Sequence, residues 1–135
     1  TSHIENTIKE KNLGDTVMLA GFRHPVLPYV AVSDFGILAS TVREGCPLSP
    51  QEYMSQARPV VTPDNGGQKE YVVNGHNGYL VPPGDKDKLA EAMSLLINDA
   101  DNRKKMGENA KADFFDHMDY EYYYKQIKAL YGEYI

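Results

Sequence analysis

The segment RPVVTPDNGGQKEYVVNGHNGYLVPPGD, residues 58–85, contains two short apolar runs separated by a polar stretch. The runs at 58–63 and 77–82 are rich in Val and Leu, and they are typical of buried strands. Residues 68–75 between them are typical of a short helix that ends at Gly75. Because a strand, a helix and a second strand in succession form a crossover unit, this segment predicts parallel strands in one sheet.

The same alternation extends toward the N-terminus. Two further apolar runs, TVMLAG at 16–21 and FGILAS at 35–40, predict two more buried strands. A helix is expected at about 50–57, and an N-terminal helix carries Ile4, Ile8 and Leu13 at helical spacing, with Gly14 as its stop. Strands that are apolar on both faces and alternate with helices indicate an α/β fold, with a Rossmann-like parallel sheet covered by helices on both faces.

Three helices are expected after residue 85. Asp85, Asp101 and Asp119 stand at their starts, where an Asp side chain can accept hydrogen bonds from free backbone N–H groups. Apolar residues at helical spacing predict the faces that point inward. These residues are Leu89, Ala92, Met93 and Leu96, then Met106, Ala110 and Phe114, then Tyr123, Ile127 and Leu130.

Composition limits the classes of function. A chain of 135 residues suits one domain, 1–135, and its start at Thr1 rather than Met leads us to expect a fragment. The net charge of -5 argues against a nucleic-acid partner. The single cysteine, Cys46, excludes an internal disulfide and fits the reducing cytoplasm. No apolar run reaches the length of a transmembrane segment. The four histidines show no metal-ligand spacing, and we expect neither a metal nor another cofactor.

The loops that leave the carboxyl ends of the strands are where such sheets bind ligands. One of them begins EGCPLSPQE, residues 44–52. Ser49, Pro50 and Glu52 match a capping box, so a helix is expected to begin inside this stretch while Glu44 stays in the loop. Helix N-termini bind phosphates, and carboxylates accept hydrogen bonds from sugar hydroxyls. Two acids beside free amides therefore suit a nucleotide sugar.

Simpler interpretations of the same residues remain open. Glu52 can serve only as the capping-box residue, and Glu44 can be a solvated loop charge. Cys46 is expected to be a small packing residue, because nothing nearby marks it as a nucleophile. The pair Gly66-Gly67 is expected to form a turn.

The order of the motifs resembles a known family. The stretches REGCPLSPQEYM, RPVVTPDNGGQKE and NGYLVPPGDKDKL, followed by KKMGENA, resemble the donor-binding C-terminal domain of GT-B fold glycosyltransferases, specifically the retaining family 4. The resemblance covers residues 21–110. Three positions depart from the pattern: Cys46 replaces a common aromatic residue, Tyr53 a common alanine, and Ala57 a common glycine.

The resemblance implies roles for individual residues. Glu44 is expected to be catalytic and to contact the transferred sugar, while Glu52 holds the ribose diol. Asp34 and Glu70 match family positions, and we expect both to be mainly structural. The backbone of the glycine-rich loop approaches the diphosphate and sugar, and a second loop holds the nucleobase; these loops comprise Gly45, Cys46, Pro47 and Leu48, and Phe22, Arg23 and His24, respectively.

The implied activity is transfer of a sugar from a nucleotide diphosphate sugar to a glycan, lipid or other acceptor, as in polysaccharide biosynthesis. The resemblance implies that an N-terminal domain, absent from this chain, holds the acceptor, so the fragment alone is expected to be inactive. It leaves peripheral membrane association of the full-length enzyme open. Two alternatives remain, an epimerase-like GT-B enzyme and a non-catalytic nucleotide-sugar-binding module; the spacing of Glu44 and Glu52 favours the transferase over the epimerase.

Overall fold

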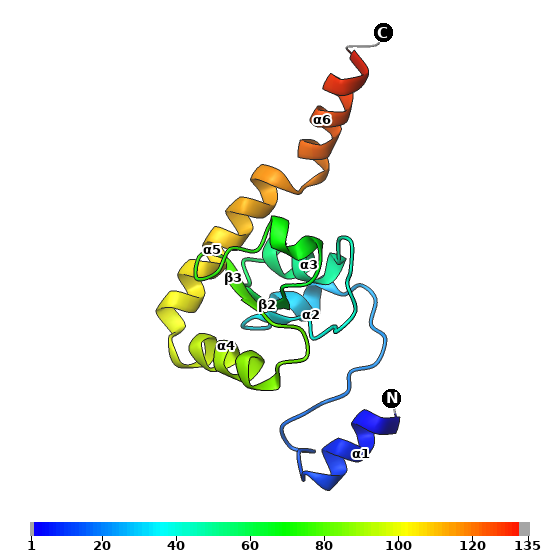
Figure 1. The fold of residues 1–135 in the computed structure, drawn as a ribbon, viewed down its shortest axis with the longest axis vertical. Coiled ribbons are helices and arrows are strands. Elements are labelled where there is room, and N and C mark those ends of the chain that lie inside the picture. The colour runs from blue at the N-terminus through cyan, green and yellow to red at the C-terminus, as the bar shows by residue number, and fades with distance from the viewer. Residues whose placement is uncertain (1, 133–135) are drawn as a thin grey trace.

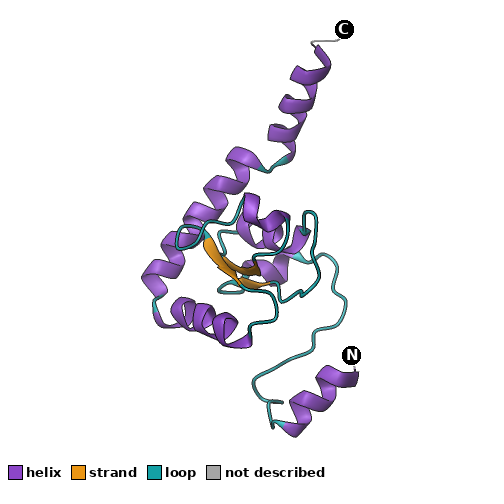
Figure 2. Ribbon diagram, viewed as in Figure 1, coloured by secondary structure: helices purple, strands orange, loops and turns teal. Residues whose placement is uncertain are grey.

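A computed structural model describes residues 2–132, which form a small sheet with helices packed around it and a further helix extending away from it near each end (Figures 1 and 2). The elements in chain order are α1 (Ser2–Glu10), α2 (Leu27–Ala31), β1 (Gly36–Ile37), α3 (Leu48–Ser55), β2 (Val60–Pro63), the 3₁₀ helix η1 (Gly67–Glu70), β3 (Gly78–Val81), α4 (Lys86–Asn98), α5 (Ala100–His117) and α6 (Tyr120–Gly132).

The sheet has three parallel strands in the order β1-β2-β3. In the register, Gly36 stands opposite Val60, which stands opposite Gly78. The central strand β2 is buried at every position, as expected for a strand covered on both faces. The parallel α/β fold predicted from the sequence is confirmed, and so are the strands within 58–63 and 77–82.

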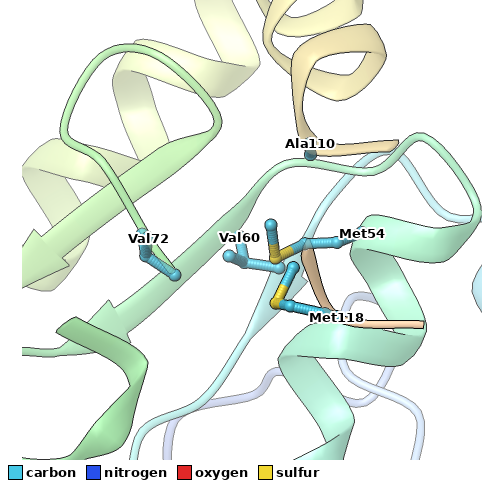
Figure 3. Close-up of a cluster of buried hydrophobic side chains, with 5 residues drawn as sticks. All are labelled: Met54, Val60, Val72, Ala110 and Met118. Atoms are coloured by element: carbon cyan, nitrogen blue, oxygen red, sulfur yellow. The ribbon is translucent and has the colours of Figure 1, made fainter. Parts of the chain in front are cut away.

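Two apolar clusters cover the two faces of the sheet. Successive residues of a strand point to opposite faces, so Val60 belongs to one cluster and Val61 to the other. The Val60 cluster also contains Met54, Val72, Ala110 and Met118 (Figure 3).

The second cluster joins Val61 to α4 and the start of α5. Its other buried members are Val81, Ala92, Leu96 and Met106. Fully burying a side chain of the size of Met or Leu stabilises a fold by about 1.5–3 kcal/mol. The inward residues expected on α4 and α5 are confirmed, because Ala92, Leu96, Met106 and Ala110 are buried and Leu89, Met93 and Phe114 are partly buried.

The strand expected at 16–21 is absent, and this prediction was wrong. The segment runs as an extended loop, and the side chain of Met18 is 87% exposed. A strand forms only beside a partner that pairs with its backbone. In a doubly wound sheet of order 3-2-1-4-5-6, strand 3 lies at one edge, and strands 2 and 1 separate it from strand 4. If residues 16–21 correspond to strand 3 of such a sheet and β1 to β3 correspond to strands 4 to 6, the described residues contain no partner for residues 16–21.

Other boundaries also differ from those expected. The strand expected at 35–40 is limited to Gly36–Ile37, and the helix expected at 68–75 is limited to the turn Gly67–Glu70. The N-terminal helix ends at Glu10 rather than at Gly14, since Asn12 takes the left-handed conformation at φ 52°. Asn is one of the few residues other than Gly that adopts this conformation readily.

The helix caps were predicted correctly in two cases of three. Asp85 accepts hydrogen bonds from the N–H groups of Asp87 and Lys88, and Asp119 accepts one from Tyr122. Asp101 does not cap α5. The cap is Asp99, which accepts from the N–H of Asn102 at 2.9 Å. Both acids suit an N-cap, and local sequence does not distinguish starts two residues apart.

The prediction that α6 turns one face inward was also wrong. Tyr123, Ile127 and Leu130 are 48%, 53% and 59% exposed. Figure 1 shows α6 projecting past α5, away from the sheet, while α1 lies apart at the end of a long loop. Helical spacing identifies an apolar face but not what covers it, so the periodicity was right and its environment was not.

The turn between α3 and β2 has one residue in the left-handed conformation and one close contact with the backbone of α5. Ala57 lies in the left-handed region at φ 57°, which explains why glycine is common at this position. A Cβ atom on Gly107 would lie 2.2 Å from the carbonyl oxygen of Ala57. The glycine of KKMGENA therefore lets α5 contact the turn that precedes β2.

Replacing Ala57 with glycine should increase the free energy of unfolding by about 1 kcal/mol, because the left-handed conformation strains alanine but not glycine. Urea denaturation measures this. The control Ala90→Gly, at an exposed position inside α4, should lower the free energy of unfolding by about 1 kcal/mol. Destabilisation by Ala57→Gly would show that the turn is not strained.

Candidate functional site

The candidate site lies at the carboxyl edge of the sheet, where the loop after β1 meets the segment after β2. Glu44 belongs to the first loop, and its carbonyl oxygen accepts a hydrogen bond of 3.0 Å from the N–H of Gly67. This backbone bond fixes the beginning of the 44–48 loop against the beginning of η1. The loop expected to bind a ligand is therefore held at the edge where parallel sheets bind ligands.

Two glycines make this contact possible. A Cβ atom on Gly66 would lie 2.3 Å from the carbonyl oxygen of Glu44, and one on Gly67 would lie 1.7 Å from that of Gly45. Any side chain at these positions would force the two segments apart. The glycine pair was interpreted from the sequence as a turn. The structure gives it a second role, since it lets two backbones touch.

The capping box predicted at the start of α3 does not form. The helix begins at Leu48, its N-cap is Pro47 in an extended conformation, and no side chain caps it. Ser49 is thus already inside the first turn, and Glu52 is one turn further along the helix. Pro50 fits this earlier start because its missing N–H is among those that a helix leaves unpaired at its beginning.

The end of the loop is held by two side chains. The carbonyl oxygen of Pro47 accepts hydrogen bonds of 3.3 Å from the Tyr71 hydroxyl and from Nε2 of Gln51. Gln51 Nε2 also lies 3.0 Å from Sγ of Cys46. Burial, with smaller effects from Cys46 and Glu44, raises the pKa of Tyr71, so its hydroxyl stays protonated as a donor.

Four of the residues expected to bind substrate line two neighbouring cavities. Leu48 and Glu52 line one of about 340 Å³, and Gly45 and Cys46 line another of about 370 Å³. Met118 contributes to both. Neither of these two cavities is lined by both Glu44 and Glu52.

Glu44 and Cys46 differ in how far they are exposed to solvent. Glu44 is half-buried, and its recorded hydrogen bond is made by its backbone. Cys46 is exposed, which corrects the expectation that it is a packing residue. Pro47 between Cys46 and the helix is buried.

The predicted nucleobase loop is exposed along its length. Phe22 is 90% exposed, Arg23 donates a hydrogen bond to the carbonyl oxygen of Phe22, and His24 is also exposed. The loop leads into α2, whose first residue, Leu27, lines the same cavity as Glu52. It therefore approaches the candidate site from the side of Glu52.

Asp34 and Glu70 lie in different surroundings. Asp34 forms an ion pair of 3.1 Å with Arg103 on α5, which supports a structural role. Glu70 is exposed and lines the cavity of Gly45 and Cys46 beside Tyr71. Tyr71 was not predicted to belong to the site. Its only sequence signal is its place directly after the motif GGQKE.

Two classes of feature are not found among the described residues. No three His, Cys, Asp or Glu side chains within 2–132 are placed to hold one metal ion. None of the helices in this part of the chain combines the length and apolar character that crossing a bilayer requires.

Comparison with known proteins identifies the family. The family model for "Glycosyl transferases group 1" matches residues 1–113. The chain belongs to this family. Among curated relatives, the alpha-1,3/1,6-mannosyltransferase ALG2 of Dictyostelium discoideum is 37% identical over 83 residues, which are 62% of this chain and 20% of that protein.

Solved structures show the same fold. HepE from Anabaena, crystallised in complex with UDP, superposes with a TM-score of 0.93 at 27% identity, covering 98% of this chain and 36% of that protein. Sucrose-phosphate synthase from Thermosynechococcus elongatus gives a TM-score of 0.87 at 28% identity, covering 98% of this chain and 33% of that one. The chain thus spans 20% to 36% of the length of these GT-B relatives.

Replacing Gly67 with alanine should displace the 44–48 loop from η1, because the added methyl group would clash with the carbonyl group of Gly45. We expect the free energy of unfolding to fall by roughly 1–3 kcal/mol, the usual cost of overpacking. The control Gly14→Ala, where no atom lies within 4 Å, should change it by at most about 0.5 kcal/mol. Urea denaturation of both variants checks this, and equal stability of Gly67→Ala and wild type would contradict the contact.

Proposed function

We propose that this chain is the donor-binding part of a retaining glycosyltransferase of the family 4 type. The full-length enzyme would transfer a sugar from a nucleotide diphosphate sugar to a glycan, lipid or other acceptor, and the acceptor would be held by a further domain. One observation carries the proposal: the 44–48 loop is fixed by backbone contacts at the carboxyl edge of the sheet, directly before a helix that no side chain caps.

The missing cap supports binding of a diphosphate. In a capping box, the Glu52 side chain would have accepted a hydrogen bond from the N–H group of Ser49. Without it, the N–H groups of Leu48 and Ser49 have no side-chain acceptor. Free amides at the positive end of a helix are suited to phosphate oxygens. The first turn of α3 is therefore more open to an anion than the sequence predicted.

The remaining residues have roles that follow from their chemistry. The Gly45, Cys46, Pro47 and Leu48 backbone would approach the diphosphate and the sugar, and Phe22, Arg23 and His24 would hold the base. The Glu52 carboxylate would accept hydrogen bonds from the ribose hydroxyls. Glu44 would face the transferred sugar, where positive charge grows as the diphosphate leaves, and a carboxylate stabilises that charge. No metal or cofactor is part of this proposal.

The relatives support the nucleotide-sugar donor. HepE binds UDP in its crystal structure, and further structures of HepE contain UDP with glucose and UDP-glucose. A relative in Staphylococcus aureus, CapM, is a capsular polysaccharide biosynthesis glycosyltransferase. A role in polysaccharide biosynthesis on the cytoplasmic side, with peripheral membrane association left open, is the extension of this proposal to the whole protein.

Replacing Glu44 with glutamine in the full-length enzyme should lower turnover on the order of a hundredfold, by analogy with the loss of one oxyanion-hole donor. The melting temperature should hardly change, because the recorded bond of Glu44 is made by its backbone, which glutamine retains. Steady-state kinetics and thermal unfolding should be measured on one preparation.

The matched control is Glu108→Gln, which removes an exposed carboxylate on α5 and should change neither quantity. Unchanged turnover together with a lower melting temperature for Glu44→Gln would contradict the catalytic role. Binding of nucleotide sugar without turnover of any acceptor would favour a non-catalytic module.

A further inference from the structure

We infer that Tyr71 is a positioning residue that fastens the 44–48 loop to the η1 segment, so that the amides proposed to hold the diphosphate keep their place. The inference rests on the proposed function, because it concerns how the same loop is held. Its evidence is the hydrogen bond from the hydroxyl of the half-buried Tyr71 to one carbonyl oxygen of the loop.

The loop is tied to one segment at both of its ends. At the beginning, the N–H of Gly67 donates to the carbonyl of Glu44 at 3.0 Å. At the end, the Tyr71 hydroxyl donates to the carbonyl of Pro47 at 3.3 Å. Gly67 and Tyr71 stand four positions apart along one turn, so this turn holds the loop at both ends. The other donor to Pro47, Gln51, belongs to α3 and moves with the loop.

Tyr71 is itself held by a buried side chain and by packing. Its carbonyl oxygen accepts a hydrogen bond of 2.8 Å from Nδ2 of Asn77, which is fully buried. The same nitrogen donates to Oδ2 of Asp113 on α5 at 2.7 Å. The ring of Tyr71 packs against the Val60 cluster. These contacts connect the loop, through Tyr71, to the sheet and to α5.

The Tyr71 hydroxyl stays protonated and therefore remains a hydrogen-bond donor. Removal from water disfavours the tyrosinate form, and burial raises the pKa of Tyr71 above its ordinary range. The bond to Pro47 should therefore persist at every pH at which an enzyme is assayed. A phenylalanine at this position would keep the ring packing and remove only the donor.

The test compares a nucleoside diphosphate with its nucleoside, because only the former reaches the loop amides. UDP, GDP and ADP are titrated into the full-length protein by calorimetry, and the tightest binder is used with its own nucleoside. Tyr71→Phe should weaken diphosphate binding about three- to tenfold, the effect of one hydrogen bond, and leave nucleoside binding unchanged. In kinetics, KM for the nucleotide sugar should rise by a similar factor.

Two controls separate this role from packing. Tyr131 is exposed near the end of α6, and Tyr131→Phe should leave diphosphate affinity unchanged. Glu52→Gln should weaken the diphosphate and the nucleoside alike, because both carry the ribose. Melting temperatures are recorded for all variants.

The outcomes are distinguishable. Wild-type protein that binds none of the three diphosphates would overturn the proposed function, and the inference with it. Wild-type binding that Tyr71→Phe leaves unchanged would overturn the inference alone. Equal losses for diphosphate and nucleoside in Tyr71→Phe, with a lower melting temperature, would show that Tyr71 serves packing only and would also overturn it.

Discussion

The backbone contact between the 44–46 loop and the pair Gly66-Gly67 is the constraint on which the candidate site depends. A loop after one parallel strand normally contacts its neighbour through side chains, whose rotamers leave some freedom. Here the two chains touch with no Cβ atom between them, and a hydrogen bond joins Glu44 to Gly67. The loop therefore has little room to move toward or away from the sheet edge, which places the first amides of α3 at a defined position.

How far the sequence predicts this fold depends on the range of the interactions involved. The strands within 58–63 and 77–82 and the caps at Asp85 and Asp119 were predicted, because apolar runs and Asp side chains act on residues nearby in the chain. The strand at 16–21 was not, because a strand needs a distant partner. The exposure of α6 was missed for a similar reason, since its apolar face says nothing about which surface covers it.

The local structure of the candidate site was predicted in part for the same reasons. The motifs indicated a loop followed by a helix within 44–57, and both are present, but the capping box at Ser49 and Glu52 was wrong. Pro50 suits either start, because its missing N–H would be unpaired at the first or at the third helical position, so local preference does not choose between them. The contribution of Tyr71 could not be predicted, since a bond over 24 positions has no local signature.

The three departures from the family pattern change side chains in the loop and along α3: Cys46 lies within the loop, Tyr53 on α3, and Ala57 in the turn after α3. Tyr53 places its ring where a Cβ on Gly36 would lie, 2.4 Å from its Cγ atom, so the glycine in β1 makes room for a larger side chain on α3. Ala57 keeps the left-handed turn that glycine would adopt without strain. Cys46 leaves an open cavity beside the loop, while Tyr71 holds the adjacent carbonyl. If a diphosphate is bound through backbone amides, as proposed, these substitutions alter the shape of the cavity beside the loop and retain the geometry that would bind the diphosphate.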